Sequence, residues 1–130
     1  MPLTVYIYFP RPSEKGQEFL DSVSSSIPGS LIEVISDRAG LSAWIYRPKD
    51  PSSVMIFWNP THTELRQIGA MKDLLLGVRT VLVLPDGEAE TVALAQQIRP
   101  VSITYVDDGT STIVSVLKRL SEIGGTSVER

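Results

Sequence analysis

Five short runs of apolar and β-branched residues recur along the chain, and stretches with helical spacing separate them. The runs are Thr4–Phe9, Leu31–Ile35, Val54–Trp58, Thr80–Leu84 and Val101–Val106. Each run has the length of a strand, and the segments between them place apolar residues three to four positions apart, as one face of a helix does. Strands that alternate with helices predict a parallel sheet with helices packed on both of its faces. We therefore expect a three-layer, doubly wound α/β fold.

The five runs differ in a way that predicts their order in the sheet. Thr4–Phe9, Val54–Trp58 and Thr80–Leu84 are almost continuously apolar, which is typical of central strands buried on both faces. Glu33 interrupts the second run, and polar residues alternate with apolar ones in the fifth run, VSITYV. Those two runs fit the edges of the sheet better. The predicted strand order is 2-1-3-4-5, which is the flavodoxin-like order.

Two helices are predicted in the first part of the chain. Ser13 can cap the first, whose apolar residues extend to Ile27 before Pro28-Gly29 breaks it. Asp37 can cap a short second helix that carries Leu41, Trp44 and Ile45. A strand through 42–46 is an open alternative for this segment.

Three further helices are predicted after the third run. Thr61 starts one of them with Glu64 in a capping box, and Gly77 is expected to end it. The next covers Glu88–Arg99 and is expected to turn Val92, Ala95 and Ile98 inward. The last starts at Thr110 or Ser111 and is expected to end before Gly124-Gly125. We predict one domain over residues 1–124 and a frayed tail at 125–130.

Composition excludes several classes of function. The chain has 130 residues, of which 42% are hydrophobic, and no cysteine, so a thiolate metal site and a cysteine nucleophile are excluded. The net charge of −3 argues against nucleic-acid binding, and apolar stretches of five residues are too short for a membrane span. The N-terminal residues lack the pattern of a signal peptide. We expect a cytoplasmic domain.

The segment RPKDPSSVMIFWNP (residues 47–60) resembles the short-helix, Pro-Asp, apolar-strand, Pro stretch of the receiver domains of bacterial response regulators. The five strand–helix units extend this resemblance over nearly the whole chain. The resemblance implies an aspartate after strand three that accepts a phosphoryl group, an acidic pair after strand one that holds magnesium, and a lysine after strand five. Here Trp58-Asn59 ends strand three, Pro10-Arg11-Pro12 follows strand one and Asp107-Asp108 follows strand five. We therefore expect a degenerate, receiver-like domain that is not phosphorylated by the family's route and has no cofactor, no metal and no catalytic residue.

Ligands of open α/β sheets bind beyond the carboxyl ends of the strands, which we call the C-terminal edge of the sheet. The polar residues expected there are Arg11, Asn59, Thr61, His62, Asp86, Asp107 and Asp108. Arg11 and the start of the third helix could bind an anion. The plainer interpretation is that Thr61 is a helix cap, Asn59-Pro60 is a turn and the aspartates belong to turns before helices. His62 lacks a partner nucleophile, and the chain has neither a GxGxxG nor a GxxxxGK[ST] phosphate loop.

An interaction role has slightly better support. The segment GEAETVALAQQIR (residues 87–99) is rich in small residues, so its outer face could contact a protein. In receivers the face formed by the fourth helix, fifth strand and fifth helix commonly makes dimer or partner contacts. The resemblance therefore implies a partner-binding face that contains Ala89, Val92, Ala93, Gln96 and Tyr105. Leu74-Leu75-Leu76 adds a second hint, because three consecutive leucines cannot all face one core.

Three hypotheses about function follow. The first is a non-catalytic signalling domain that binds a protein partner or a second copy of itself. The second is a small-molecule or anion sensor at the C-terminal edge. The third is a hydrolase or transferase whose catalytic residues have no familiar pattern.

Overall fold

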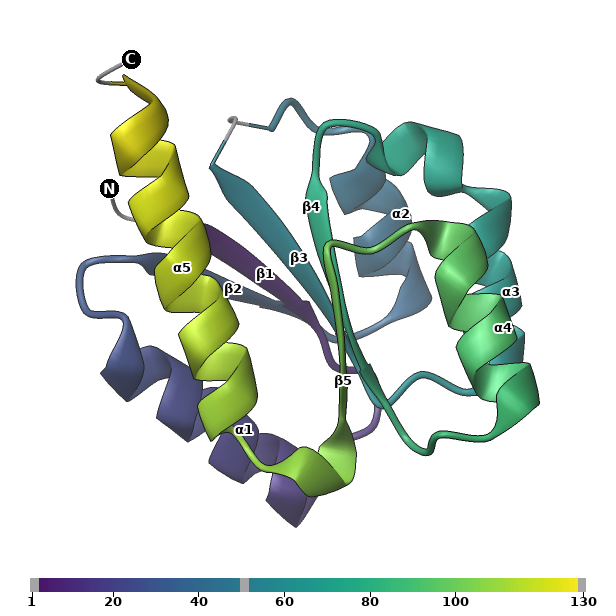
Figure 1. Cartoon of the computed structure of the whole chain (residues 1–130). Coiled ribbons are helices and arrows are strands. Elements are labelled where there is room, and N and C mark those ends of the chain that lie inside the picture. The colour runs from purple at the N-terminus through teal and green to yellow at the C-terminus, as the bar shows by residue number, and fades with distance from the viewer. Residues whose placement is uncertain (1–2, 50–51, 129–130) are drawn as a thin grey trace.

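The computed structural model describes residues 3–49 and 52–128, with side chains up to Leu120. Its five strands form one parallel sheet in the order β2-β1-β3-β4-β5, as predicted (Figure 1). The strands are β1 (Thr4–Tyr8), β2 (Leu31–Ile35), β3 (Ser53–Trp58), β4 (Arg79–Leu84) and β5 (Ser102–Tyr105). The fold is therefore flavodoxin-like.

Helices follow each strand and cover both faces of the sheet. They are α1 (Glu14–Ser26), α2 (Arg38–Ile45), α3 (His62–Ala70), α4 (Ala89–Ile98) and α5 (Ser111–Val128), with short 3-10 helices η1 (Lys72–Leu75) and η2 (Val106–Asp108). Figure 1 shows α1 and α5 on one face and α2, α3 and α4 on the other. None of the helices within the described residues is long and apolar enough to cross a membrane.

The sheet separates two hydrophobic cores. Side chains of successive strand residues point to opposite faces, so Met55 and Phe57 of β3 join the core under α2, α3 and α4. Val54 and Ile56 join the core under α1 and α5. All six residues of β3 are buried, as expected for the middle strand of the sheet. β2 buries only Ile35, which agrees with its predicted place at an edge.

The predicted helix starts are confirmed by their caps. The side chain of Ser13 accepts a hydrogen bond from the Gly16 N–H, and the side chain of Asp37 accepts one from the Gly40 N–H. The segment after Asp37 is a helix, so the alternative of a strand through 42–46 is wrong. Trp44 of this helix is buried, whereas Tyr46 behind it is exposed.

Two predicted helix details are wrong. The third helix ends at Ala70, and η1 follows before Gly77, because Leu75 has to turn back toward the core. Leu74 and Leu76 point outward on either side of Leu75, as the leucine run indicated. In α4 the buried residue of the first turn is Thr91, and Val92 is only half-buried.

The fifth helix is longer than predicted, since α5 continues through Gly124-Gly125 to Val128. Glycine in a helix costs about 1 kcal/mol relative to alanine but does not forbid helical backbone. The predicted tail therefore begins inside this helix, and residues 129–130 lie outside the described residues.

Candidate functional site at the C-terminal edge of the sheet

Arg11 follows β1 and contacts the residue after β3, at the place where the sequence predicted an anion site. Its charge is already paired. Its Nη1 is 2.8 Å from Oε2 of Glu64, and its Nη2 donates a 2.6 Å hydrogen bond to the carbonyl oxygen of Asn59. Asn59 holds a left-handed backbone with φ of 51°, which turns its carbonyl toward Arg11. Arg11 thus ties the end of β3 to the first turn of α3.

The first turn of α3 is also closed by its own cap. The Glu64 N–H donates to Oγ1 of Thr61, and the Thr61 N–H donates to Oε1 of Glu64. This capping box uses two of the N–H groups that an anion would need. Burial raises the pKa of Glu64, but hydrogen bonds from Arg11 and Thr61 outweigh it, so the pKa lies below its ordinary value. An anion placed here would meet the Glu64 carboxylate.

His62 connects α3 to α4 through Thr91. Its Nε2 is 2.7 Å from Oγ1 of Thr91, and its Nδ1 is 3.2 Å from Oε2 of Glu90. A hydrogen bond from the Thr91 hydroxyl is the largest cause that lowers the pKa of Asp86, and a bond from the Glu88 backbone adds to it. His62 therefore contacts the first turn of α4 through both of its ring nitrogens.

This His62–Thr91–Asp86 chain contains a base, a hydroxyl and a carboxylate, so a catalytic interpretation has to be examined. Thr91 is completely buried, and a nucleophile needs access to its substrate. Its hydroxyl oxygen is also in hydrogen-bond contact with Nε2 of His62, at 2.7 Å. The chain of contacts therefore fixes the start of α4 against α3.

Asp107 and Asp108 contact other residues than Asp86 does. Asp107 forms a 2.9 Å ion pair with Lys15 of α1, and both side chains are well exposed. Oδ2 of Asp108 accepts a hydrogen bond from the Tyr105 N–H. Within the described part of the chain, no group of three or more His, Asp or Glu side chains is placed to bind a metal ion.

A small hollow of 230 Å³ opens between α2 and α3 beside the end of β1. Tyr8, Arg38, Glu64 and Gln67 supply its polar surface. Burial is the main cause that raises the pKa of Tyr8, and the nearby Glu64 carboxylate adds to it. The volume falls short of the roughly 300–1,000 Å³ of common ligand pockets.

The structure adds several residues to those predicted from sequence. Tyr8, Arg38, Glu64, Glu90 and Thr91 all take part in contacts at or near this edge. Only Glu64 had a sequence signal, as the partner of Thr61 in the capping box. The others depend on how α2, α3 and α4 pack, which local patterns do not specify.

The predicted interaction residues lie on α4 and β5. Ala89, Ala93 and Gln96 are exposed, whereas Val92 and Tyr105 are half-buried. The large exposed apolar side chains are elsewhere: Leu31 and Val34 on β2, and Tyr46, Leu74, Leu76 and Val101 in connections that lead into β3, β4 and β5.

The fold has a counterpart among solved structures. The chain is similar to the crystal structure of a protein from Burkholderia pseudomallei K96243 that is provisionally described as pilus assembly-related. The TM-score is 0.67 with 13% identity, and the match covers 92% of this chain and 90% of that chain. At this identity the likeness shows the fold alone. No family model and no curated protein matches the sequence.

Proposed function

We propose that the chain is a receiver-like protein-interaction domain that does not accept a phosphoryl group. Its role is to bind a protein, either a partner or a second copy of itself. A place in a larger assembly agrees with the description of the Burkholderia protein of similar fold.

This proposal rests on one observation: most polar side chains at the C-terminal edge of the sheet are already paired with one another. Phosphoryl transfer by a carboxylate needs a nucleophilic oxygen, a magnesium site and cationic groups that converge on one point. Here Arg11 is paired with Glu64, His62 with Thr91 and Glu90, and Lys15 with Asp107. These contacts join secondary-structure elements to one another and use the same groups that a reaction would require.

The face of α4 and β5 is the candidate contact surface in this proposal. Its exposed small residues, Ala89 and Ala93, would let a flat partner surface approach the helix closely. Tyr105 on the neighbouring strand is half-buried and could extend the contact.

Sedimentation equilibrium over a wide concentration range tests the interaction role. We expect association that Ala93→Arg weakens and that Ser24→Arg, on the exposed side of α1, leaves unchanged. If Ala93→Arg leaves the association unchanged, the contact surface is not on α4. If the wild-type chain stays monomeric at all concentrations, self-association is excluded and the partner has to be a different protein.

One observation favours a second candidate, a small-molecule or anion sensor. The hollow beside β1 has Arg38 on its wall, and the described residues offer this guanidinium no ion-pair partner. Phosphate or acetate titrations followed by amide NMR would then shift the signals around Arg38 and Tyr8. Shifts spread evenly over the surface would count against this candidate.

A further inference from the structure

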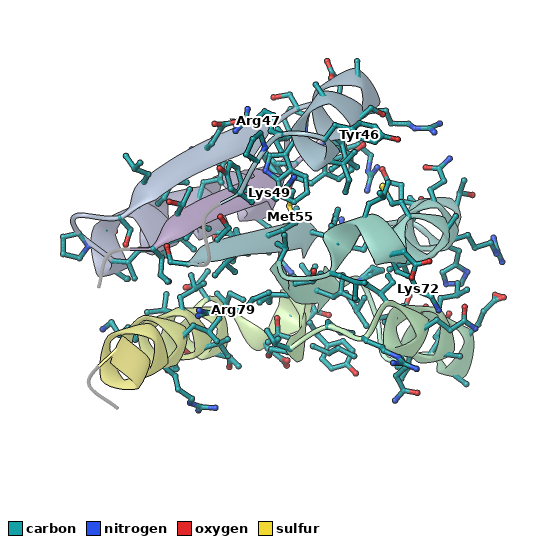
Figure 2. The ribbon with its side chains drawn as sticks, turned by 90° about the horizontal axis from the view of Figure 1, so that it is seen from above. Tyr46, Arg47, Lys49, Met55, Lys72 and Arg79 are labelled. Carbon is teal, nitrogen blue, oxygen red and sulfur yellow. The ribbon has the colours of Figure 1, made fainter. Side chains whose placement is uncertain are left out.

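Opposite to the candidate site lies the edge at which the strands begin, which we call the N-terminal edge of the sheet. The connections that enter β3, β4 and β5 there, together with the first residue of β4, carry five cations against one described carboxylate, Asp73. The cations are Arg47, Lys49, Lys72, Arg79 and Arg99. Figure 2 looks onto this edge and labels Tyr46, Arg47, Lys49, Lys72 and Arg79. Five of the chain's twelve Lys and Arg residues thus lie at this edge, in a chain whose net charge is −3.

Two of these cations are available for a new contact. Lys72 and Arg99 are exposed, line the same hollow of 460 Å³ and have no ion-pair partner among the described residues. The other three are engaged: Arg47 pairs with Glu33, Lys49 donates to the carbonyls of Ile45 and Arg47, and Arg79 donates to that of Leu120.

Apolar side chains accompany the free cations. Leu76 lines the same hollow and is 80% exposed, and Val101, next to Pro100, is 54% exposed. Exposed leucines are unremarkable singly, but exposed apolar groups gathered beside unpaired charges are typical of a contact surface.

The C-terminal edge has the opposite charge. Its connections and first helical turns contain eight carboxylates against three Lys or Arg side chains. The acids are Glu14, Asp37, Glu64, Asp86, Glu88, Glu90, Asp107 and Asp108, and the cations are Arg11, Lys15 and Arg38. Acidic side chains near the start of a helix interact favourably with the helix dipole, so these carboxylates have a local reason to be there. Their sum nevertheless gives the molecule two oppositely charged edges at the two ends of its strands.

The C-terminal edge also has a place for an apolar side chain. A hollow of 150 Å³ there is lined by Trp58, Val106 and Asp107, among others. It combines apolar surface with a carboxylate whose only described partner is the exposed Lys15.

We propose that the N-terminal edge binds the C-terminal edge of a second copy of the chain. Lys72 and Arg99 of one copy meet Asp107 and Glu88 of the next, and Leu76 packs on the hollow lined by Trp58 and Val106. Such a contact joins two different surfaces, so it leaves a free edge at each end and permits chains of copies rather than a closed dimer. This inference rests on the interaction role of the proposed function, names a second copy of the chain as the partner, and assigns self-association to these two edges instead of to the face of α4 and β5.

The test uses the full chain in three charge variants. The first, Lys72→Glu/Arg99→Glu, reverses the N-terminal edge, and the second, Glu88→Lys/Asp107→Lys, reverses the C-terminal edge. The control, Lys118→Glu/Arg119→Glu on the exposed side of α5, changes net charge as the first variant does but lies outside both proposed contact surfaces. Circular dichroism first establishes that each variant is folded.

Sedimentation velocity at low salt should show wild-type association that grows with concentration and is lost at high salt. Each of the two reversed variants should be monomeric, the control should still associate, and an equal mixture of the two reversed variants should form a complex. Leu76→Ser should weaken association of the wild type. Any of three results would overturn the inference. The mixture could stay monomeric, the reversed variants could associate like the wild type, or the wild type could fail to associate at any concentration.

The outcomes separate this inference from the proposed function. Association that Ala93→Arg abolishes and the charge reversals do not affect would leave the interaction role standing with a contact on α4. A monomeric wild type would remove self-association by these edges and leave the role of binding a different protein to be tested separately.

Discussion

Nε2 of His62 lies 2.7 Å from the hydroxyl oxygen of Thr91, a residue 29 positions away on the next helix. The Thr91 hydroxyl in turn donates to Asp86, and this bond is the main cause that lowers the pKa of the Asp86 carboxyl. One buried hydroxyl therefore joins the end of β4, the start of α3 and the first turn of α4.

Thr91→Val should raise the pKa of Asp86 toward its ordinary value of about 3.9. Valine keeps the shape of threonine but cannot donate, so the carboxylate loses its strongest stabilising bond. Carbon-13 NMR titration of the Asp86 carboxyl measures this directly. An unchanged Asp86 titration would mean that the hydroxyl does not make this bond.

Glu64→Gln and Glu64→Ala should separate the two roles of Glu64. Glutamine retains the cap on Thr61 but loses the ion pair with Arg11, at an expected cost of about 0.5–1 kcal/mol. Alanine loses both, and the expected cost rises to about 1–2 kcal/mol. Urea denaturation at neutral pH measures both. Equal losses would show that only one of the two contacts stabilises the fold.

Acid should remove the ion-pair contribution of Glu64. Its pKa is lowered in the folded state, so the unfolded chain binds more protons as pH falls below about 4.3. The stabilisation is thus complete above that pH and is lost as pH falls through the folded-state pKa. The difference in unfolding free energy between wild type and Glu64→Gln should shrink over this range, and a difference that is constant down to pH 3 would contradict this account.

Gly16→Ala and Gly69→Ala should have opposite effects on stability. A methyl group at Gly16 of α1 would overlap the ring of Phe9, whereas nothing lies within 4 Å of one at Gly69 of α3. Overpacking at Gly16 should cost about 1–3 kcal/mol. Alanine at Gly69 should stabilise by about 0.5–1 kcal/mol, because it favours helix. Thermal unfolding of both variants checks the pair, and a stabilised Gly16→Ala would show that Phe9 moves freely.

Arg99→Gly should stabilise the fold, whereas Asn59→Gly should be nearly neutral. Both residues have positive φ, 58° at Arg99 and 51° at Asn59. A left-handed backbone costs an arginine about 1–2 kcal/mol, which glycine avoids at some entropic cost, so a net gain of up to about 1 kcal/mol is expected. Asparagine already tolerates this conformation. Equal effects in chemical denaturation would mean that the side chains, rather than the backbone, decide stability at these sites.

The fold was predictable because its signals are local. Continuous apolar runs marked β1, β3 and β4 as central strands, and Glu33 marked β2 as an edge. Ser13, Asp37 and Thr61 marked helix starts by their capping chemistry. The helix ends were less certain, because glycine weakens a helix without stopping it, as Gly124-Gly125 in α5 shows.

The contacts at the C-terminal edge were predictable only in part. The sequence placed Arg11, Asn59 and His62 at this edge, but their partners depend on tertiary packing. His62 meets Thr91 only because α3 and α4 lie side by side, and the predicted inward face of α4 contained Val92 in place of Thr91. Residues that a sequence presents as possible ligand contacts are here used to join one helix to another.

Treatment with magnesium and acetyl phosphate, followed by intact-protein mass spectrometry and amide NMR, tests the central claim most directly. We predict an unchanged mass and no signal changes beyond those of a magnesium chloride control, because no group of three acidic or histidine side chains among the described residues converges on a metal site, and Arg11 and Lys15 are paired with carboxylates. A stable phosphoprotein, with the phosphoryl group on Asp86, Asp107 or Asp108, would contradict the account and make the chain a working receiver.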